Sequence, residues 1–525
     1  MRKYFVLFFV LMSFTFAQLM RPTQHALISD TLIQGLIGNG IGDIAGQGDT
    51  LWFTTGYGLS GTYDYGDSFF GISRQFSNIG KGSLSALATS GDTLWFATGF
   101  DSVINAESYQ TGGGISYSTN AGQSWTSFEQ PMDSLRWYTD NNGQQKSYTY
   151  SGFEVYGDTV LAVDVVTPIT NITFDLAYDG KRLWATSFAG GLRVSHNHGQ
   201  TWRRVLLPWD DVDILNETVF NSMLSDIKAS PEYYSIDPVL HMNHRAFSVV
   251  ARNDTIVVGT AGGINLSLDG GISWQRWTSL NSNITGNWVV ALHLQTTPDD
   301  IIIWASTVNT NSRETQGISA LSLNNRYWET ALEGFRINNF GSNEQFVYAA
   351  TDDGLYVSRD GLHFLNFPTI VSSDGRDRIY SESVFSVFVD DYNRIWVGTG
   401  DGLAWSDDKG ETWQIEKSGQ AVEDDTFFAY PNPFSPRHQK VFQGEGNLII
   451  RFTAQSNTSI TLDVYDFSMR RVRNILDGVP SVFDGKQETT WNGKNEKGEY
   501  IANGTYFLRL QKADKSFWSK VMIVN

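Results

Sequence analysis

Residues 395–413 read IWVGTGDGLAWSDDKGETW, and this stretch contains both halves of a unit that recurs along the chain. The first half is an apolar strand with Trp396 at its second position, and the second half has the pattern S-x-D-x-G-x-T-W at Ser406 to Trp413. Six further copies of the strand half begin at Leu51, Leu94, Leu183, Ile256, Ile303 and Val347. A period of about 45 residues at most steps indicates a row of similar β units that bury their faces against one another.

The second half predicts a turn between two strands. Its clear copies include Asn120 with Trp125, Asn197 with Trp202, Asp269 with Trp274 and Asp408 with Trp413; a variant lies at Asp64, and degraded copies lie at 322–328 and 358–364. A short acid or amide accepts backbone N–H bonds, the glycine adopts a left-handed conformation, and the tryptophan buries a large apolar area. We interpret these acids as structural rather than catalytic or calcium-binding, because Asn replaces Asp at positions 120 and 197.

These repeats resemble the Asp-box, or bacterial neuraminidase repeat, of β-propellers. The LWxGTxxGL strand is similar to propeller repeats of two-component regulator sensors. The resemblance covers residues 30 to 418 and implies an all-β fold, whereas the motif is shared by enzymes and non-enzymes. Seven copies predict a seven-bladed β-propeller of about four strands per blade, with six or eight blades as alternatives.

Two long insertions interrupt the period, at Gln130 to Thr170 and at Leu206 to His244. Both follow the fourth strand of a four-stranded blade. We call the turn formed by the S-x-D-x-G-x-T-W pattern the box turn, and blade geometry predicts that the insertions lie on the face opposite the box turns. We expect a helix at Asp213 to Ile227 over the channel and a ligand-binding surface for a glycan or protein on this face. Its candidate residues are Trp137, Tyr138, Trp209, Asp210 and Asp211. The alternative is that these aromatic side chains only pack their own loops.

The tail differs in character from the repeats. A linker is expected at 421–436, followed by alternating strands at Leu448 to Phe452 and Ile460 to Asp466 and by Ala502 to Leu510. The YPNPF entry, the WNGKNEKGE turn and the NGTYFLRL strand resemble the immunoglobulin-like domain of the flagellar hook-capping protein and the C-terminal sorting domain of type IX secretion cargo. That resemblance implies that residues 437–525 form a small immunoglobulin-like β-sandwich that secretion machinery recognises. A sandwich without a targeting role is the alternative.

The N-terminus and the composition predict an exported protein. Arg2, Lys3 and the apolar run Tyr4 to Phe16 are typical of a signal peptide at 1–17, which leaves 18–420 for the propeller. We therefore expect a secreted or outer-surface location reached through the periplasm, without membrane insertion. A net charge of −18 argues against nucleic-acid binding, and the chain contains no cysteine for disulfides or thiolate sites.

Motifs for chemistry are not found in the sequence. The segment Phe335 to Asn338 lies too late for the sialidase pattern, and the histidines lack metal-ligand spacing. We predict no cofactor and no metal, and a binding or scaffold module that is not clearly an enzyme. The alternatives are a polysaccharide-active glycoside hydrolase that uses the insertion face, for which Glu217 and Asp213 are nearby acids, and a sensory ectodomain.

Overall fold

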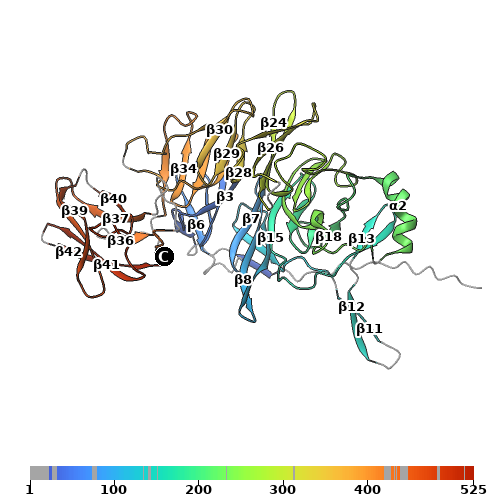
Figure 1. The fold of residues 1–525 in the computed structure, drawn as a ribbon, viewed down its shortest axis with the longest axis horizontal. Helices are drawn as coiled ribbons and strands as arrows, with labels where there is room; N and C mark the ends of the chain where they lie inside the picture. The colour runs from blue at the N-terminus through green and yellow to red at the C-terminus, as the bar shows by residue number, and fades with distance from the viewer. Residues whose placement is uncertain are drawn as a thin grey trace, which may run out of the picture.

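The structure is a computed structural model. It describes residues 23–524 apart from 27–31, 74–79, 134, 140–143, 150–151, 232, 311–313, 376, 419–426, 431, 433, 438–446, 482–484 and 514. The described residues form many small antiparallel sheets with one α-helix, so the all-β prediction is confirmed (Figure 1).

Seven successive sheets each contain four strands that are consecutive in the chain. The first three sheets are β3 (Ile41–Gln47), β4 (Thr50–Thr55), β5 (Gly58–Thr62) and β6 (Phe70–Ser73); β7 (Ser83–Ser90), β8 (Thr93–Ile104), β9 (Glu107–Ser118) and β10 (Ser124–Phe128); and β15 (Thr173–Tyr178), β16 (Leu183–Ser187), β17 (Gly191–Ser195) and β18 (Arg203–Val205). The fourth and fifth are β20 (Ala246–Arg252), β21 (Thr255–Thr260), β22 (Gly263–Ser267) and β23 (Trp274–Trp277); and β24 (Trp288–Thr296), β25 (Ile301–Val308), β26 (Gly317–Ser322) and β27 (Trp328–Ala331). The sixth and seventh are β28 (Ile337–Ser342), β29 (Val347–Thr351), β30 (Gly354–Ser358) and β31 (Leu365–Asn366); and β32 (Val384–Val389), β33 (Ile395–Thr399), β34 (Gly402–Ser406) and β35 (Gln414–Glu416).

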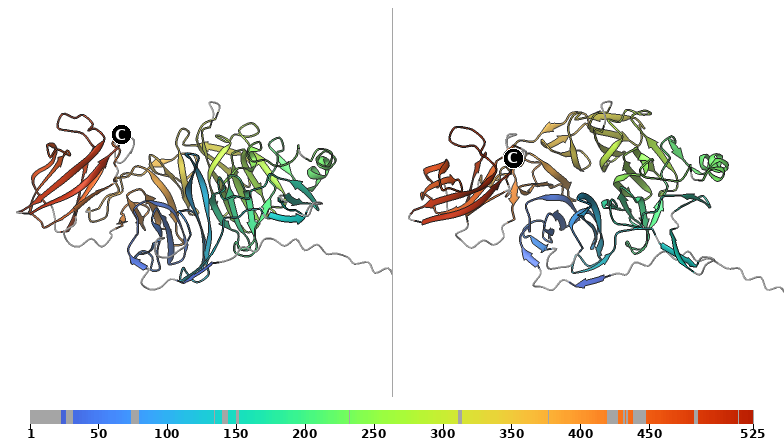
Figure 2. Two further views of the ribbon diagram at one scale, coloured as in Figure 1. Left: turned by 90° about the horizontal axis from the view of Figure 1, so that it is seen from below. Right: turned by 60° about the horizontal axis from the view of Figure 1, so that its bottom comes forward.

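The first strands of these sheets form a closed ring. Each first strand contacts the first strand of the next sheet, and β32 of the seventh sheet contacts β3 of the first. The Ser386 hydroxyl donates to the Ile41 carbonyl at 3.3 Å across this junction. Figure 2 shows the sheets arranged around a common centre. The ring therefore closes by side-by-side packing of its first and last sheets.

Three sheets carry a fifth strand on their outer edge. These strands are β1 (Thr23–Ala26) on β10, β2 (Leu32–Gln34) on β6 and β19 (Ile214–Leu215) on β23. The N-terminal strand thus pairs with the second sheet. Strand β1 covers the outer edge of β10, whose backbone groups would otherwise be unpaired.

Successive sheets are locked together by one recurring contact between the two halves of the repeat. Gly122 and Gly271 lie at positive φ, and a β-carbon on either would lie 2.5 Å or 2.7 Å from the ring of Trp52 or Trp184 in the preceding sheet. Gly66 and Gly361 approach Trp396 and Trp304 in the same way. Each glycine therefore serves the turn and also leaves space for the buried indole of its neighbour.

The C-terminal residues form two facing sheets around a core of their own. One sheet contains β36 (Phe427–Tyr430), β37 (Leu448–Ala454) and β40 (Gly485–Trp491), and the other contains β38 (Ser459–Tyr465), β39 (Arg471–Pro480), β41 (Gly504–Lys512) and β42 (Lys515–Ile523). Leu448, Leu462 and Leu508 are fully buried between them. The first strand begins at Phe427, inside the stretch expected to be a linker, because β36 pairs along β37.

The two insertions pack against the outer rim of the ring. They contain β11 (Leu135–Thr139), β12 (Gln145–Thr149), β13 (Gly152–Val155), β14 (Asp158–Leu161), α2 (Glu217–Ala229) and the short 3-10 helix η2 (Met242–His244). Phe153, Val160 and Phe220 share one buried cluster with Trp184 of the third sheet and Trp274 of the fourth. The predicted helix exists, but it lies at the rim and not over the channel (Figure 2), because its buried residues Phe220 and Ile227 contribute to this outer cluster.

Candidate functional site

The box turns share one pattern of hydrogen bonds. In the seventh sheet, Asp408 accepts the backbone N–H of Thr412 at 2.8 Å and its hydroxyl at 2.6 Å, while Ser406 donates to the same carboxylate at 2.7 Å. The equivalent acid or amide accepts the backbone N–H four residues later at Asp64, Asn120, Asn197 and Asp269. These bonds, led by the one from the Thr412 side chain, lower the pKa of Asp408 to about 2. Such carboxylates have their oxygens engaged by their own turn.

The degraded copies keep the same arrangement with other residues. In the sixth sheet Asp360 accepts the backbone N–H of His363 at 2.8 Å and contacts its imidazole at 2.7 Å. In the fifth sheet the acid comes from a different turn, where Asp300 accepts from Ser322 and from the backbone of Asn324. The turn therefore needs an acceptor at this place in space, whichever segment supplies it.

Two of the residues predicted to bind a ligand have structural partners. Trp209 is only 3% exposed, and its indole N–H donates to the Tyr234 carbonyl at 3.3 Å. Asp210 accepts the backbone N–H groups of Met242 and Asn243, both at 2.8 Å. These bonds join residues of the second insertion to one another and fix its own fold.

The other three predicted residues are less constrained. Asp211 is exposed, and the side chains of Trp137 and Tyr138 lie outside the described part of the structure, although their backbones pair within the β11–β12 hairpin. The first insertion also extends to the box side of the rim, where the Tyr156 hydroxyl donates to the Ile272 carbonyl at 2.7 Å. Of the five predicted residues, the structure describes three side chains: Trp209 is buried, and Asp210 and Asp211 are exposed.

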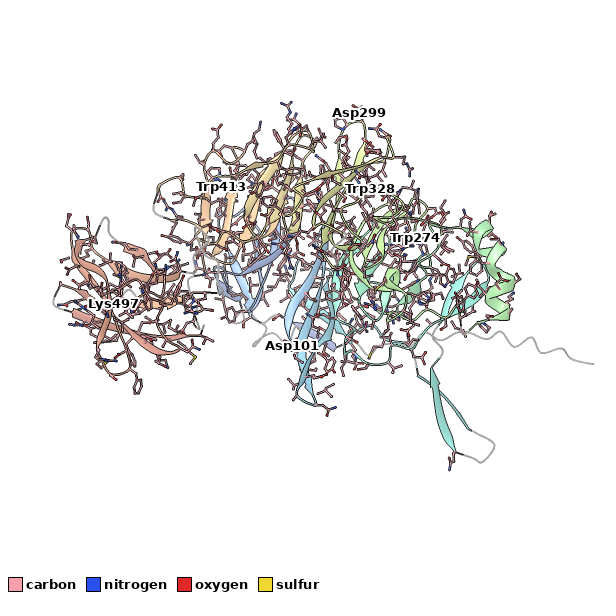
Figure 3. The ribbon with its side chains drawn as sticks, viewed as in Figure 1. Asp101, Trp274, Asp299, Trp328, Trp413 and Lys497 are labelled. Carbon is pink, nitrogen blue, oxygen red and sulfur yellow. The ribbon has the colours of Figure 1, made fainter. Side chains whose placement is uncertain are left out.

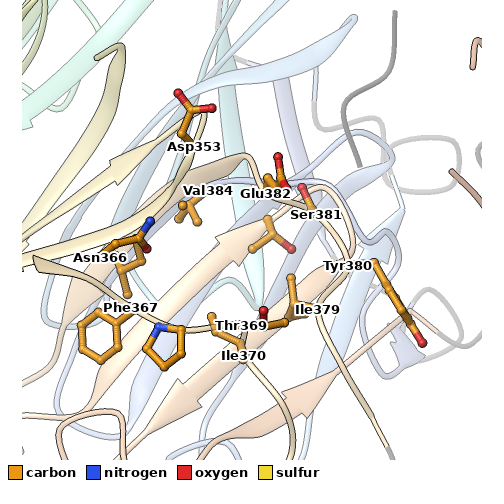
Figure 4. Close-up of a pocket in the computed structure, with 14 residues that line it drawn as sticks. Asp353, Asn366, Phe367, Thr369, Ile370, Ile379, Tyr380, Ser381, Glu382 and Val384 are labelled. Atoms are coloured by element: carbon orange, nitrogen blue, oxygen red, sulfur yellow. The ribbon is translucent and has the colours of Figure 1, made fainter. Parts of the chain in front are cut away.

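A cavity of about 250 Å³ lies between the sixth and seventh sheets. It lies on what we call the connection face, where second strands join third strands and fourth strands join the next sheet. Its floor is apolar, with Leu355, Ile370, Ile379 and Val384 each at most 6% exposed. Figure 4 shows three polar residues bordering the cavity: Asp353 of the β29–β30 connection, Asn366 at the end of β31, and Glu382 of the β31–β32 connection.

The polar rim of this cavity is acidic. Its lining includes the carboxylates of Asp353 and Glu382, the amide of Asn366 and the hydroxyl of Thr369, and none of the described residues that line it is a lysine or an arginine. Within the described residues, the Asp353 carboxylate makes neither a hydrogen bond nor an ion pair, in contrast to the box acids. Asn366 donates to the Tyr356 hydroxyl at 3.3 Å, which leaves its amide oxygen toward the rim as an acceptor.

One wall of the cavity also contacts the C-terminal domain. The Tyr380 backbone N–H donates to Asp401 at 2.9 Å, and Lys417 bonds to Asp401 at 3.0 Å and to Glu488 of β40 at 3.4 Å. The Lys417 and Asp401 side chains are 5% and 2% exposed. Burial raises the pKa of Asp401, and the ammonium of Lys417 opposes that rise. This cluster fixes the connection at 367–383 between the cavity and the tail.

The long 367–383 connection was missed in the sequence because the strand β31 is only two residues long. A short fourth strand and a long connection add up to an ordinary distance between the repeats that start at Val347 and Ile395. Only the degraded box at 358–364 gave a local signal that this unit departs from the pattern.

Two further acids lie on first strands near the centre of the ring. Burial raises the pKa of both Asp43 on β3 and Asp175 on β15 to about 7, and repulsion from Asp43 contributes at Asp175. Asp175 accepts the backbone N–H of Val249 in the neighbouring sheet at 2.9 Å and that of Leu176 at 2.8 Å. The carboxyl group thus ties two first strands together while favouring its neutral form.

Metal and membrane sites were also sought. Among the described residues, no group of three or more His, Asp or Glu side chains could hold a metal ion. No helix in the described part of the chain has both the length and the apolar character needed to cross a membrane.

A closed ring of antiparallel sheets with repeated box turns defines a propeller-like all-β protein. No protein-family model matches the chain, and no curated protein matches it either. Among solved structures it is similar to PorZ, a bacterial surface component of the type-IX secretion system of Porphyromonas gingivalis (11% identity, 93% of this chain and 75% of that chain, TM-score 0.30). It is also similar to an ancestral GH74 enzyme (12% identity, 93% and 63%, TM-score 0.44) and to YCF48 from Cyanidioschyzon merolae (14% identity, 75% and 100%, TM-score 0.36). With scores this low, the fold assignment depends on the sheets themselves.

Proposed function

We propose that this protein is a secreted or surface-displayed bacterial seven-bladed β-propeller that acts as a binding or scaffold module. The observation that carries the proposal is the acidic cavity with an apolar floor on the connection face. Rigid sheets hold the two connections that border it, which is the usual relation between a scaffold and its binding loops. The proposed ligand is an extracellular glycan or protein.

The binding role is tested with the full chain on glycan and peptide arrays, followed by affinity measurement for any ligand found. Glu382→Lys reverses a charge at the cavity rim and should weaken binding at least tenfold. Asp299→Lys is the matched control, because Asp299 lies in the β24–β25 turn on the opposite, box-bearing face (Figure 3). Equal losses for the two variants would place the ligand elsewhere.

We further propose that the C-terminal residues form an immunoglobulin-like sorting domain for the type IX route. Deletion of residues 427–525 should leave the remaining chain in the periplasm, as measured by cell fractionation. Glu488→Gln in the full chain is the control, since it alters the contact with Lys417 without removing the domain. Normal appearance of the deleted form in the medium would exclude a sorting role.

One observation favours a second candidate function, glycoside hydrolysis. Asp43 and Asp175 interact electrostatically near the centre of the ring, and a carboxyl group with a raised pKa is what a glycosidase uses as general acid. The structural role of Asp175 as a backbone acceptor explains it equally well. Release of reducing ends from polysaccharides that disappears in Asp43→Asn and Asp175→Asn would decide for the hydrolase.

A further inference from the structure

The size of the cavity between the sixth and seventh sheets limits what it can hold. Its volume of about 250 Å³ lies below the range of about 300–1,000 Å³ that is usual for drug-sized ligands. A volume below that range favours one long side chain over an oligosaccharide. The floor is apolar, so an occupant that is polar along its length would lose its hydration there without gain.

The charges around the cavity specify the other end of the occupant. Asp353 and Glu382 contribute carboxylates, and the described residues that line the cavity include no cationic side chain, so the charges of this lining favour a cation. The rim offers mainly acceptors, which are the Asp353 carboxylate, the Asn366 amide oxygen and the Thr369 hydroxyl. The nearest lysine on the wall side, Lys417, is held by Asp401 and Glu488 and does not line the cavity.

We infer that this cavity accepts a lysine or arginine side chain from an extended polypeptide, an assignment that rests on the binding function proposed above. The aliphatic stem lies on Leu355, Ile370 and Val384, and the charged head remains at the rim beside Asp353. Such division of a basic side chain between an apolar surface and a polar edge is its ordinary behaviour. An ammonium or guanidinium group has only donors, which matches a rim of acceptors.

The test uses the full chain immobilised for surface plasmon resonance and capped pentapeptides of glycine with one central residue. Central lysine and arginine should bind with dissociation constants down to about 0.1–1 mM, and central norleucine, which keeps the stem without the charge, should bind at least tenfold more weakly. Binding of the lysine peptide should also weaken as salt rises, because the rim is solvent-accessible. Equal binding of the norleucine peptide overturns the inference, as does a lack of lysine-peptide binding up to about 10 mM.

Variants then locate the site. Asp353→Asn should weaken the lysine peptide at least fivefold, and Asn366→Ala about twofold, with the melting temperature of each unchanged as proof of folding. Asp299→Asn on the box-bearing face removes the same charge and should have no effect. A loss with Asp299→Asn equal to that with Asp353→Asn would show a general charge effect and refute the assignment.

Two further measurements show whether the cation belongs to a polypeptide or to a free amine, and whether this inference alone or the binding function itself is wrong. If 1,5-diaminopentane binds more tightly than the lysine peptide, the site serves free amines and the polypeptide assignment falls. If the arrays yield a ligand whose affinity is reduced by Glu382→Lys and is unaffected by Asp353→Asn, the binding function stands and this inference is wrong. If no array ligand depends on the connection face, both are wrong.

Discussion

Aspartate plays opposite parts in two regions of the ring, the box turns and the cavity between the sixth and seventh sheets. Asp269 is exposed and Asp408 is half-buried, yet each accepts hydrogen bonds from the backbone and side chains of its own turn. Asp353 occupies the two-residue connection between β29 and β30, and its carboxylate makes no such bond within the described residues. Residue type and exposure therefore do not distinguish a structural acid from a binding acid, whereas the local donors do.

The largest expected effect concerns the glycine that connects a box turn to its neighbouring sheet. Gly271→Ala introduces a methyl group at φ +88° and 2.7 Å from the Trp184 ring, so we expect a loss of about 3 kcal/mol in unfolding free energy. Gly180→Ala is the control, because Gly180 has φ +97° and no atom within 4 Å of an added β-carbon. It should lose only about 1 kcal/mol from backbone strain. Equal losses in denaturant titrations would mean that the inter-sheet contact contributes nothing.

The next largest effect is expected when the acceptor side chain of a box turn is removed. Asp269→Ala leaves the N–H of Ser273 and the Ser267 hydroxyl without their acceptor, and it should cost about 1–2 kcal/mol, as loss of a capping side chain does. Asp269→Asn should retain most of the stability, because Asn120 and Asn197 accept the same bond in the second and third sheets. A strong loss with Asn would show that the charge matters, contrary to the role assigned to the turn.

The central acids should give a pH dependence of the opposite sign to the box acids. Because the folded pKa of Asp43 and Asp175 is raised to about 7, their favourable contribution is complete below about pH 4 and is lost as the pH rises through 7. Asp175→Asn should therefore raise the melting temperature at pH 8 relative to the native chain and have little effect at pH 4. We expect a gain of roughly 1–2 kcal/mol at pH 8, because solvent contact moderates the full shift. A difference that is independent of pH would contradict the raised pKa.

For Asp408, whose pKa is lowered to about 2, the sign is reversed: its contribution is present above about pH 4 and is lost as the pH falls toward 2. Comparing acid unfolding of Asp408→Asn with that of the native chain tests this loss of stability at low pH. The variant should show the smaller loss of stability between pH 4 and pH 2.

The smallest effect on stability is expected at the cavity. Asp353→Asn should change the unfolding free energy by no more than about 0.5 kcal/mol, since the carboxylate is exposed and makes no bond that folding depends on. Circular dichroism during thermal unfolding measures this directly. A destabilisation as large as that of Asp269→Ala would remove the contrast between the two regions.

Sequence reasoning worked where the interactions are local and failed where they are not. The turn formed by Ser406, Asp408 and Gly410 is complete within eight residues, so its pattern was visible in the chain. Trp209 was expected at the surface because it stands beside acids, but its surroundings come from the rim cluster with Phe220 and Leu215. Asp300 replaces the missing acid of the fifth sheet from another turn, and no linear pattern reveals such a substitution.

The sequence by itself determined a repeated β unit, its box turns and the separate character of the tail, because each depends on neighbours a few residues apart. The tertiary structure alone decided that the insertions line the rim, that an additional edge strand joins the second sheet, and that two connections and the end of β31 border an acidic cavity. The pairing of β30 with β31 brings Asn366 to the end of the sheet that carries Asp353, and the packing of the seventh sheet places Val384 and Thr399 beside them. The donors of a box acid lie in its own turn and leave a linear pattern, whereas this cavity depends on contacts between sheets that no linear pattern records.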